Sequence, residues 1–325
     1  MKTVLISLTM LCSTLLVAQK KLTFEKMAAM PNEAYAFGYS QSSQDIFAFG
    51  GGEDFKRYSS YLHLYDTKSD IWISTEIKEV PLVKYTSSVY LEAYKGILVL
   101  GGIRPYGTSV GLVDDILMLD PADFSVTKLG TLPEPAKDMG IASDGKKVYF
   151  FGGSKRMTRN MLGTTNFVFS KKLFVYDLNN GHMEMLPDLP KAMETNGGII
   201  DGNLYVFGGF NRNPLTSIWQ YNLENRNWTE LEPFDRPVSS YALARYDRYF
   251  ILAGDYYDGN QLIVYDTKTK KASYFKTNFT GRHMGASVMG EYLHVYGGFS
   301  NSKDNFIKHD HYRISIKRLI DSLDQ

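Results

Sequence analysis

Cysteine is nearly absent from this sequence, which has only Cys12 among its 325 residues. A single thiol cannot close a disulfide within the chain, and the common structural zinc sites need several cysteine or histidine ligands. The fold must therefore be stabilised by buried apolar side chains. Hydrophobic residues make up 44% of the chain, which is enough for the core of a globular protein.

Long apolar runs and an excess of charge of one sign are also lacking. After the first 19 residues, no stretch approaches the roughly 18 continuous apolar residues of a membrane-spanning helix. Lys and Arg total 36 and Asp and Glu total 35, a net charge of +1. Binding of nucleic acid depends on a concentrated basic face, so this balance argues against a nucleic-acid partner. Aromatic residues are abundant, at 14%, which favours β-strands.

The first residues resemble a secretory leader. Lys2 gives a short basic start, and Val4–Val17 is an apolar run that only Ser, Thr and Cys interrupt. Ala18 is small enough for a cleavage site, and two lysines follow it closely. A buried N-terminal strand is the alternative. We expect residues 1–19 to be a signal peptide and the protein to be secreted or periplasmic.

Removal of such a leader would leave residues 20–325 without Cys12 and without Lys2, the only charged residue before position 20. The formal net charge would then be 0. A thiol nucleophile and a thiolate metal ligand would both be excluded from the mature chain.

A short apolar run that ends in small residues occurs six times in the sequence. Glycine can adopt a positive φ and lets a neighbouring strand approach closely. The instances are Ile46–Gly52, Ile97–Gly102, Val148–Gly153, Leu204–Gly209, Phe250–Asp255 and Leu293–Gly298. The fifth keeps only one glycine, because Asp255 stands where the others have the second.

Each run belongs to a unit of four short predicted strands. A second strand follows the glycine pair and usually ends in Asp or Asn, as in Tyr61–Asp66 and Leu262–Asp266. These residues hydrogen-bond their local backbone and start turns. Four strands at a period of roughly 45 to 55 residues are typical of a propeller blade. A β-sandwich, the alternative, would not repeat one four-strand unit six times.

The last unit lacks a convincing outer strand after Tyr312. Residues 22–27 (LTFEKM) have the pattern of the outer strands that precede prolines in other units. We therefore expect this N-terminal strand to complete the last blade and close the ring, which also protects an edge strand.

The repeat resembles the kelch family. In that family a Tyr follows the glycine doublet, and a Trp follows after six intervening residues. Tyr65 and Trp72 have this spacing, as do Tyr221 and Trp228. The resemblance implies an all-β, six-bladed kelch propeller that forms one domain over residues 20–325. Kelch propellers include enzymes, sugar-binding proteins and protein-interaction modules, so the resemblance does not indicate one activity.

The segment that enters the first strand of a blade and the loop that leaves the second emerge on the same face, around the central channel. Basic and tyrosine side chains are frequent there. Arginine grips carboxylates with two parallel hydrogen bonds, which suits an anionic or sugar-like ligand. We expect ligand-binding residues on this face to include Lys84, Arg104, Arg156, Arg212, Arg282 and Tyr256. Solvated surface is the alternative for each of them.

Two hypotheses about function follow. In the first, the chain is an exported binding module for a glycan or a protein partner. The second rests on a resemblance to periplasmic kelch proteins that are sialic-acid mutarotases. It implies a sugar mutarotase with Glu194 as acid–base group and Arg212 or Arg282 as the carboxylate clamp. Whether the chain is an enzyme stays open.

Copper chemistry of the galactose oxidase type needs a Cys crosslinked to a Tyr, which residues 20–325 cannot supply. His309 and His311 could form a metal pair, but with no third ligand nearby a surface strand is the stronger interpretation. We expect no metal, no cofactor and a monomer.

Overall fold

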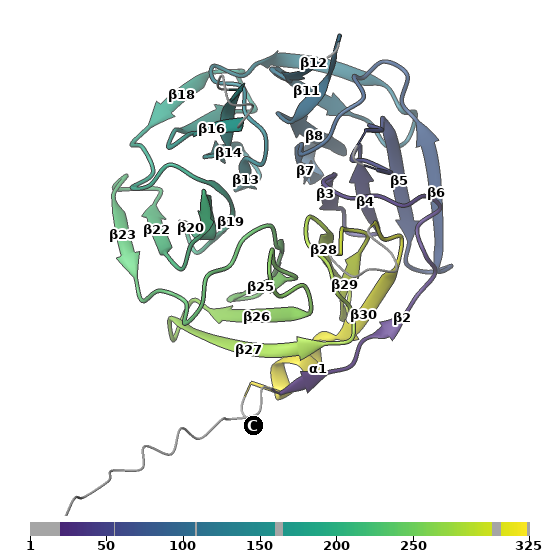
Figure 1. Ribbon diagram of the computed structural model, residues 1–325, viewed down its shortest axis with the longest axis vertical. Coiled ribbons are helices and arrows are strands. Elements are labelled where there is room, and N and C mark those ends of the chain that lie inside the picture. Colours follow the sequence, from purple (N-terminus) through teal and green to yellow (C-terminus); the bar gives the residue numbers. More distant parts are fainter. Residues whose placement is uncertain (1–19, 55, 108, 160–164, 301–306, 324–325) are drawn as a thin grey trace, which may run out of the picture.

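The computed structural model describes residues 20–54, 56–107, 109–159, 165–300 and 307–323. Residues 1–19, the predicted signal peptide, lie outside these ranges. For residues 156–159 and 165–167 only the backbone is described. Six β-sheets stand around a central axis like the blades of a propeller (Figure 1). The predicted all-β, six-bladed architecture is confirmed.

Each blade is an antiparallel sheet whose first strand lies innermost. Blade one contains β3 (Gly38–Gln41), β4 (Asp45–Phe49), β5 (Tyr61–Asp66) and β6 (Ile71–Glu76). Blade two contains β7 (Ser87–Leu91), β8 (Gly96–Leu100), β11 (Asp115–Leu119) and β12 (Val126–Thr131). Blade three contains β13 (Gly140–Ser143), β14 (Lys147–Phe151), β17 (Leu173–Asp177) and β18 (Met183–Leu186).

Blade four contains β19 (Glu194–Ile200), β20 (Asn203–Asn211), β22 (Ile218–Asn222) and β23 (Trp228–Leu231), with β21 (Asn213–Pro214) beside β20. Blade five contains β24 (Ala242–Tyr246), β25 (Tyr249–Ala253), β26 (Gln261–Asp266) and β27 (Lys271–Thr277). Blade six contains β28 (Gly285–Met289), β29 (Tyr292–Tyr296), β30 (His311–Ser315) and, from the N-terminus, β2 (Glu25–Lys26).

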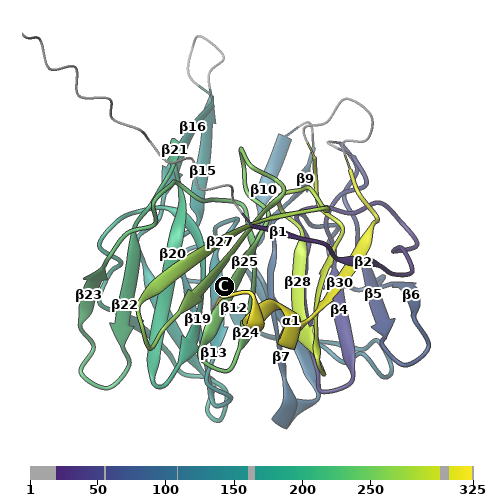
Figure 2. The same ribbon diagram turned by 90° about the horizontal axis from the view of Figure 1, so that it is seen from below.

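Two hairpins project from the face on which the glycine doublets lie (Figure 2). They are β9–β10 (Ile103–Tyr106, Ser109–Leu112) in blade two and β15–β16 (Ser154–Arg159, Thr165–Phe169) in blade three. A single 3-10 turn, Glu92–Tyr94, lies between β7 and β8. The C-terminal helix α1 (Ile316–Asp321) follows β30. No helix in the described part of the chain is both long and apolar enough to cross a membrane.

The N-terminal segment closes the ring. Its strand β2 pairs with β30, with Glu25 opposite Arg313, which confirms the predicted completion of blade six. The segment also makes a second pairing that the sequence did not predict. Its strand β1 (Lys21–Leu22) pairs in parallel with β27 of blade five. Between the two strands, the backbone N–H and carbonyl of Phe24 both bond to the Asn278 side chain, at 2.7 and 3.0 Å.

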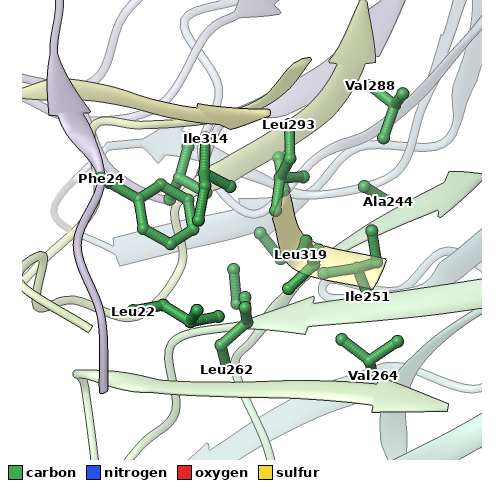
Figure 3. Packing of buried hydrophobic residues seen from close by; sticks show 14 of the residues in the cluster. Leu22, Phe24, Ala244, Ile251, Leu262, Val264, Val288, Leu293, Ile314 and Leu319 are labelled. Carbon is green, nitrogen blue, oxygen red and sulfur yellow. The ribbon is translucent and has the colours of Figure 1, made fainter. Parts of the chain in front are cut away.

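Apolar side chains fill each interface between neighbouring blades, so the core is a ring of six clusters. At the closure, Leu22 and Phe24 pack with Leu319 of α1 and with Ile314 between blades five and six (Figure 3). The chain ends therefore contribute to the core, and burial of about 25 cal/mol per Å² of apolar surface stabilises the closed ring.

The glycine doublets link the blades through their backbone. In every blade, the N–H of the second doublet residue donates to a carbonyl just before the next blade's innermost strand, as Gly102 does to Ala136 at 2.8 Å. The ring closes with Gly298 donating to Ala34 at 2.7 Å. Gly102 has φ of +99°, and a Cβ there would lie 2.5 Å from the Lys84 carbonyl oxygen, which explains the glycine.

The interpretation of His309 and His311 as part of a surface strand is wrong for His311. That side chain is fully buried at the interface between blades six and one, and its Nε2 lies 2.9 Å from Nδ1 of His294. Its other ring nitrogen, Nδ1, lies 3.2 Å from the Ala28 carbonyl oxygen. Within the described residues, no three His, Cys, Asp or Glu side chains gather as a metal site would need.

Candidate ligand-binding site at the channel mouth

Each blade places two consecutive residues at the channel mouth, just before its innermost strand. The first of them pairs with the residue after the doublet, as in Lys137↔Ser154 and Glu194↔Phe210. These first mouth positions are, in blade order, Tyr35, Lys84, Lys137, Glu194, Ser239 and Arg282. The second mouth positions are Ala36, Tyr85, Asp138, Thr195, Ser240 and His283.

Two adjoining cavities of about 200 and 220 Å³ lie at this mouth. They share six lining residues and together form what we call the mouth cavity: Tyr85, Asp138, Glu194, Phe210, Ser240 and His283. The inner part reaches down to Tyr39, and the outer part adds Lys137, Tyr256 and Arg282. Charged groups from several blades thus converge on one hollow.

A buried ion-pair cluster forms one wall of the cavity. The ammonium of Lys137 donates to Oε1 of Glu194 at 2.6 Å and to Oδ2 of Asp138 at 2.7 Å. The Ser154 hydroxyl donates to the same Glu194 oxygen. Burial raises the pKa of Glu194, with Asp138 adding to the effect and Lys137 opposing it. No described residue hydrogen-bonds Oε2 of Glu194, which leaves that atom available to a ligand.

Arg282 forms the opposite wall. Its guanidinium carbon lies 4.1 Å from the ring centre of Tyr256 and 4.9 Å from that of Phe299. Nε and Nη1 are buried and bond to no group among the described residues. Unpaired buried donors are costly unless a partner arrives, so these two N–H groups are suited to receive an anion.

His283 lies between the two walls, with Nδ1 3.8 Å from Oδ1 of Asp138. Its ring packs edge-on against Tyr85, with centroids 5.3 Å apart. Burial, together with the neighbouring charges of Lys137 and Arg282, lowers the pKa of His283 to about 3. The imidazole is therefore neutral at neutral pH.

An aromatic collar, with one ring from each blade, surrounds these charges. Phe210 stacks with Tyr256 at 5.9 Å, and Phe299 lies 5.9 Å from Tyr35. The collar consists of Tyr35, Tyr85, Phe169, Phe210, Tyr256 and Phe299. Rings around a polar centre form an apolar rim that offers flat contact surfaces to a ligand.

Tyr39 forms the floor of the mouth cavity. Its hydroxyl accepts a hydrogen bond from the Leu243 N–H at 2.6 Å and one from the Asn196 side chain at 3.2 Å. Burial raises the pKa of Tyr39 to about 12. Below it, a third hollow of about 510 Å³ opens toward the opposite face and also has Tyr39 in its wall. Tyr39 therefore lies where the mouth cavity and this third hollow adjoin.

The predicted site residues do not all meet here. Glu194, Arg282 and Tyr256 line the mouth cavity. Lys84 occupies a first mouth position but is sealed off, because its ammonium donates to the Asp54 carbonyl at 2.6 Å and lies 4.3 Å from the Tyr58 ring centre. Burial lowers the pKa of Lys84 to about 8.

The remaining three arginines lie elsewhere on the face. Arg104 is on the β9–β10 hairpin, and Arg212 is exposed at the turn after β20, so neither lines the cavity. Arg156 belongs to β15, and its side chain is outside the described part of the chain. Their roles stay predictions.

Lys137, Asp138 and His283 belong to the site but were not singled out from the sequence. Only their positions in the repeat point to them. Lys137 occupies a first mouth position, as Glu194 does, and Asp138 and His283 occupy second mouth positions. Aligning the blades on the doublets would have found them.

Comparisons with known proteins agree with this architecture. Residues 195–234 match the family model described as the Kelch motif. The chain is similar to Kelch-like protein 38 of Rattus norvegicus, at 24% identity over 79% of this chain and 43% of that protein. It is also similar to Kelch repeat and BTB domain-containing protein 1 of Horsepox virus, at 26% identity over 69% of this chain and 38% of that protein.

A third similarity, to an F-box/kelch-repeat protein of Arabidopsis thaliana, has 24% identity over 67% of this chain and 46% of that protein. The chain thus spans less than half the length of these curated relatives. The motif match, the relatives and the six four-strand blades together support a kelch-repeat β-propeller.

Proposed function

We propose that this propeller binds an acidic sugar, or a glycan that ends in one, in the mouth cavity. The observation that carries the proposal is the guanidinium of Arg282, which is buried between two aromatic rings with two N–H groups unpaired among the described residues. A carboxylate binds one edge of a guanidinium through two parallel hydrogen bonds, and each edge combines Nη2 with one of these two nitrogens.

The rest of the cavity complements the remainder of such a ligand. Sugar rings have C–H faces that pack on aromatic rings, and the collar supplies them at the rim. Sugar hydroxyls both donate and accept hydrogen bonds, and Glu194 and Asn196 offer partners of both kinds at the cavity wall.

A thermal-shift screen of residues 20–325 against sialic, uronic and neutral sugars tests the proposal. A ligand at a hundred times its Kd should stabilise the fold by about 2.7 kcal/mol. We expect a shift with acidic sugars only. Arg282→Ala should weaken binding roughly 10- to 100-fold, since hydrogen bonds to charged groups contribute about 1.5–3 kcal/mol. Arg212→Ala, outside the cavity, is the matched control.

A second candidate function, sugar mutarotation, is favoured by the environment of Glu194. Anomer exchange needs a group that removes the proton of the anomeric hydroxyl and a proton delivered to the ring oxygen. Glu194 has a pKa raised by burial and a carboxylate oxygen without a described partner. If this reading holds, Glu194→Gln should abolish catalysed anomer exchange, followed by NMR, while the acidic sugar still binds.

A protein partner is supported by exposed apolar side chains on the same face. Tyr106 and Val110 on the β9–β10 hairpin are 70% and 38% exposed, and Tyr257 beside the collar is 73% exposed. Aromatic residues of this kind are enriched in protein interfaces. Absence of a shift with every sugar would favour this partner class. We further propose that residues 1–19 direct export.

A further inference from the structure

A second ring of backbone hydrogen bonds, which we call the mouth belt, runs through the second mouth positions. In this ring the N–H of one residue donates to the carbonyl of the equivalent residue in the preceding blade. His283 donates to Ser240 at 2.7 Å, and Ala36 donates to His283 at 2.9 Å. Tyr85 donates to Ala36 at 2.6 Å, and Asp138 donates to Tyr85 at 3.1 Å. All five residues have φ between +48° and +56°. The left-handed conformation turns each N–H toward the preceding blade.

The mouth belt is open at blade four. Thr195 occupies the second mouth position there and is not among the residues with positive φ. Its side chain is β-branched, and a β-branched residue is strongly disfavoured in the left-handed region. It extends strand β19 instead, with its hydroxyl donating to the Phe207 carbonyl at 3.1 Å.

The opening leaves two main-chain groups without the partner that their counterparts have. In a closed belt, the N–H of Ser240 would donate to the main-chain carbonyl of residue 195. The carbonyl of Asp138 would accept from the main-chain N–H of residue 195. Neither group has a hydrogen-bond partner among the described residues. Ser240 and Asp138 both line the mouth cavity, with Glu194 between them in blade order. Folded proteins pair most of their main-chain groups, so these two groups on a cavity wall are available to a ligand.

We propose that the open segment of the mouth belt is where a ligand hydroxyl binds. The Ser240 N–H donates to that hydroxyl, and a hydroxyl of the same ligand donates to the Asp138 carbonyl. Thr195 is thus a specificity-determining residue, because its β-branched side chain keeps the segment open. The ligand class is a polyhydroxylated carboxylate with its acid group on Arg282, so this inference rests on the proposed function.

The first test needs no ligand. Amide hydrogen exchange of residues 20–325 by NMR should show the Ser240 amide exchanging at least about tenfold faster than the four belt amides of Ala36, Tyr85, Asp138 and His283, because hydrogen bonding slows exchange. Equal protection of all five amides would overturn the open belt. This result is independent of whether any sugar binds.

The second test closes the belt by mutation. Asparagine adopts the left-handed conformation readily, so Thr195→Asn should let position 195 join the belt and should protect the Ser240 amide. Binding of N-acetylneuraminate or galacturonate, followed by calorimetric titration, should then weaken about tenfold, the loss of one to two hydrogen bonds. Thr195→Val is the control, because it loses the hydroxyl but stays β-branched.

The outcomes separate the two proposals. If Thr195→Val binds as the wild type does and Thr195→Asn binds weakly, the assignment of the open segment is supported. If both variants bind like the wild type although the Ser240 amide becomes protected in Thr195→Asn, the segment is not the hydroxyl site. If the wild type binds neither sugar while the Ser240 amide exchanges fast, the proposed function fails and the open belt stands.

Discussion

The carboxylate of Asp255 accepts a hydrogen bond from the Ser239 N–H at 2.8 Å, across the mouth segment of its own blade. Its other oxygen accepts from the N–H groups of Tyr257 and Asp258 at 2.9 and 3.0 Å. Asp255 stands where the other five blades have the second glycine of the doublet. The departure from the repeat thus shapes the loop that carries Tyr256 over Arg282.

Replacement of Asp255 should therefore affect both stability and the site. Asp255→Ala leaves three backbone N–H groups without their acceptor, so we expect the free energy of unfolding to fall by roughly 1.5–3 kcal/mol or more in urea denaturation. Asp258→Ala, which removes a partly exposed ion pair with Lys276, should cost less than about 1 kcal/mol. Similar losses for both variants would contradict this role of Asp255.

The N-terminal closure should carry a large share of the stability. Phe24 is 3% exposed in the cluster between blades five and six and packs edge-on against Phe279 at 5.0 Å. Phe24→Ala should lower the free energy of unfolding by about 3–5 kcal/mol, the usual cost of such a cavity. Glu25→Ala, the exposed neighbour, should change it by less than about 1 kcal/mol. A small effect of Phe24→Ala would show that the ring is stable without this strand.

Removal of either partner of the Lys137–Glu194 pair should strongly destabilise the folded protein. Their side chains are only 11% and 14% exposed, and Lys137→Met would leave a buried carboxylate without its cation. Breaking a buried pair in this way costs about 3–5 kcal/mol. Lys128→Met, which breaks the more exposed pair with Asp115, is the control. The prediction fails if chemical denaturation gives the same midpoint for both variants.

Stability should decrease in mild acid because several histidines are buried and neutral. Burial lowers the pKa of His294 to about 3 and those of His63 and His311 to about 4. In the unfolded chain a histidine titrates near about 6.5. As the pH falls below about 6.5, the unfolded state takes up these protons first, and stability declines until about pH 3, the folded-state pKa of His294.

Each such proton costs about 1.4 kcal/mol per pH unit, and above about pH 7.5 these groups contribute no pH dependence. Urea denaturation between pH 8 and pH 4.5 measures the slope. His63→Gln should flatten it, since Gln can keep a bond to Ser74, whereas His309→Gln, outside the buried set, should leave it unchanged. An unchanged slope in His63→Gln would exclude this histidine as a source.

Much of the fold could be predicted from the doublets alone. A buried strand that ends in glycine occurs six times, with a glycine pair in five copies, and indicates strand order and blade number. The incomplete last blade points to the N-terminal strand. The parallel pairing of β1 with β27 could not be predicted, because a two-residue strand leaves no periodicity. The burial of His311 was missed because alternation in a short strand does not say which face is covered.

The site could be predicted only in part. Arg282 and Glu194 meet because both occupy first mouth positions, which the repeat specifies. Lys84 shares that position, yet the loop before β5 folds over it and takes its ammonium away from the cavity. Whether a first mouth residue faces the cavity thus depends on the path of a neighbouring loop. The frequency of Arg, Lys and Tyr on this face does not predict that path.

The most direct measurement of the central claim is a crystal structure of residues 20–325 soaked with N-acetylneuraminate. The account predicts that the sugar lies inside the aromatic collar, with its carboxylate within hydrogen-bond distance of the Arg282 guanidinium and a hydroxyl on the Ser240 N–H. A sugar bound on another face, or a mouth cavity that stays without sugar at a saturating concentration, would contradict it.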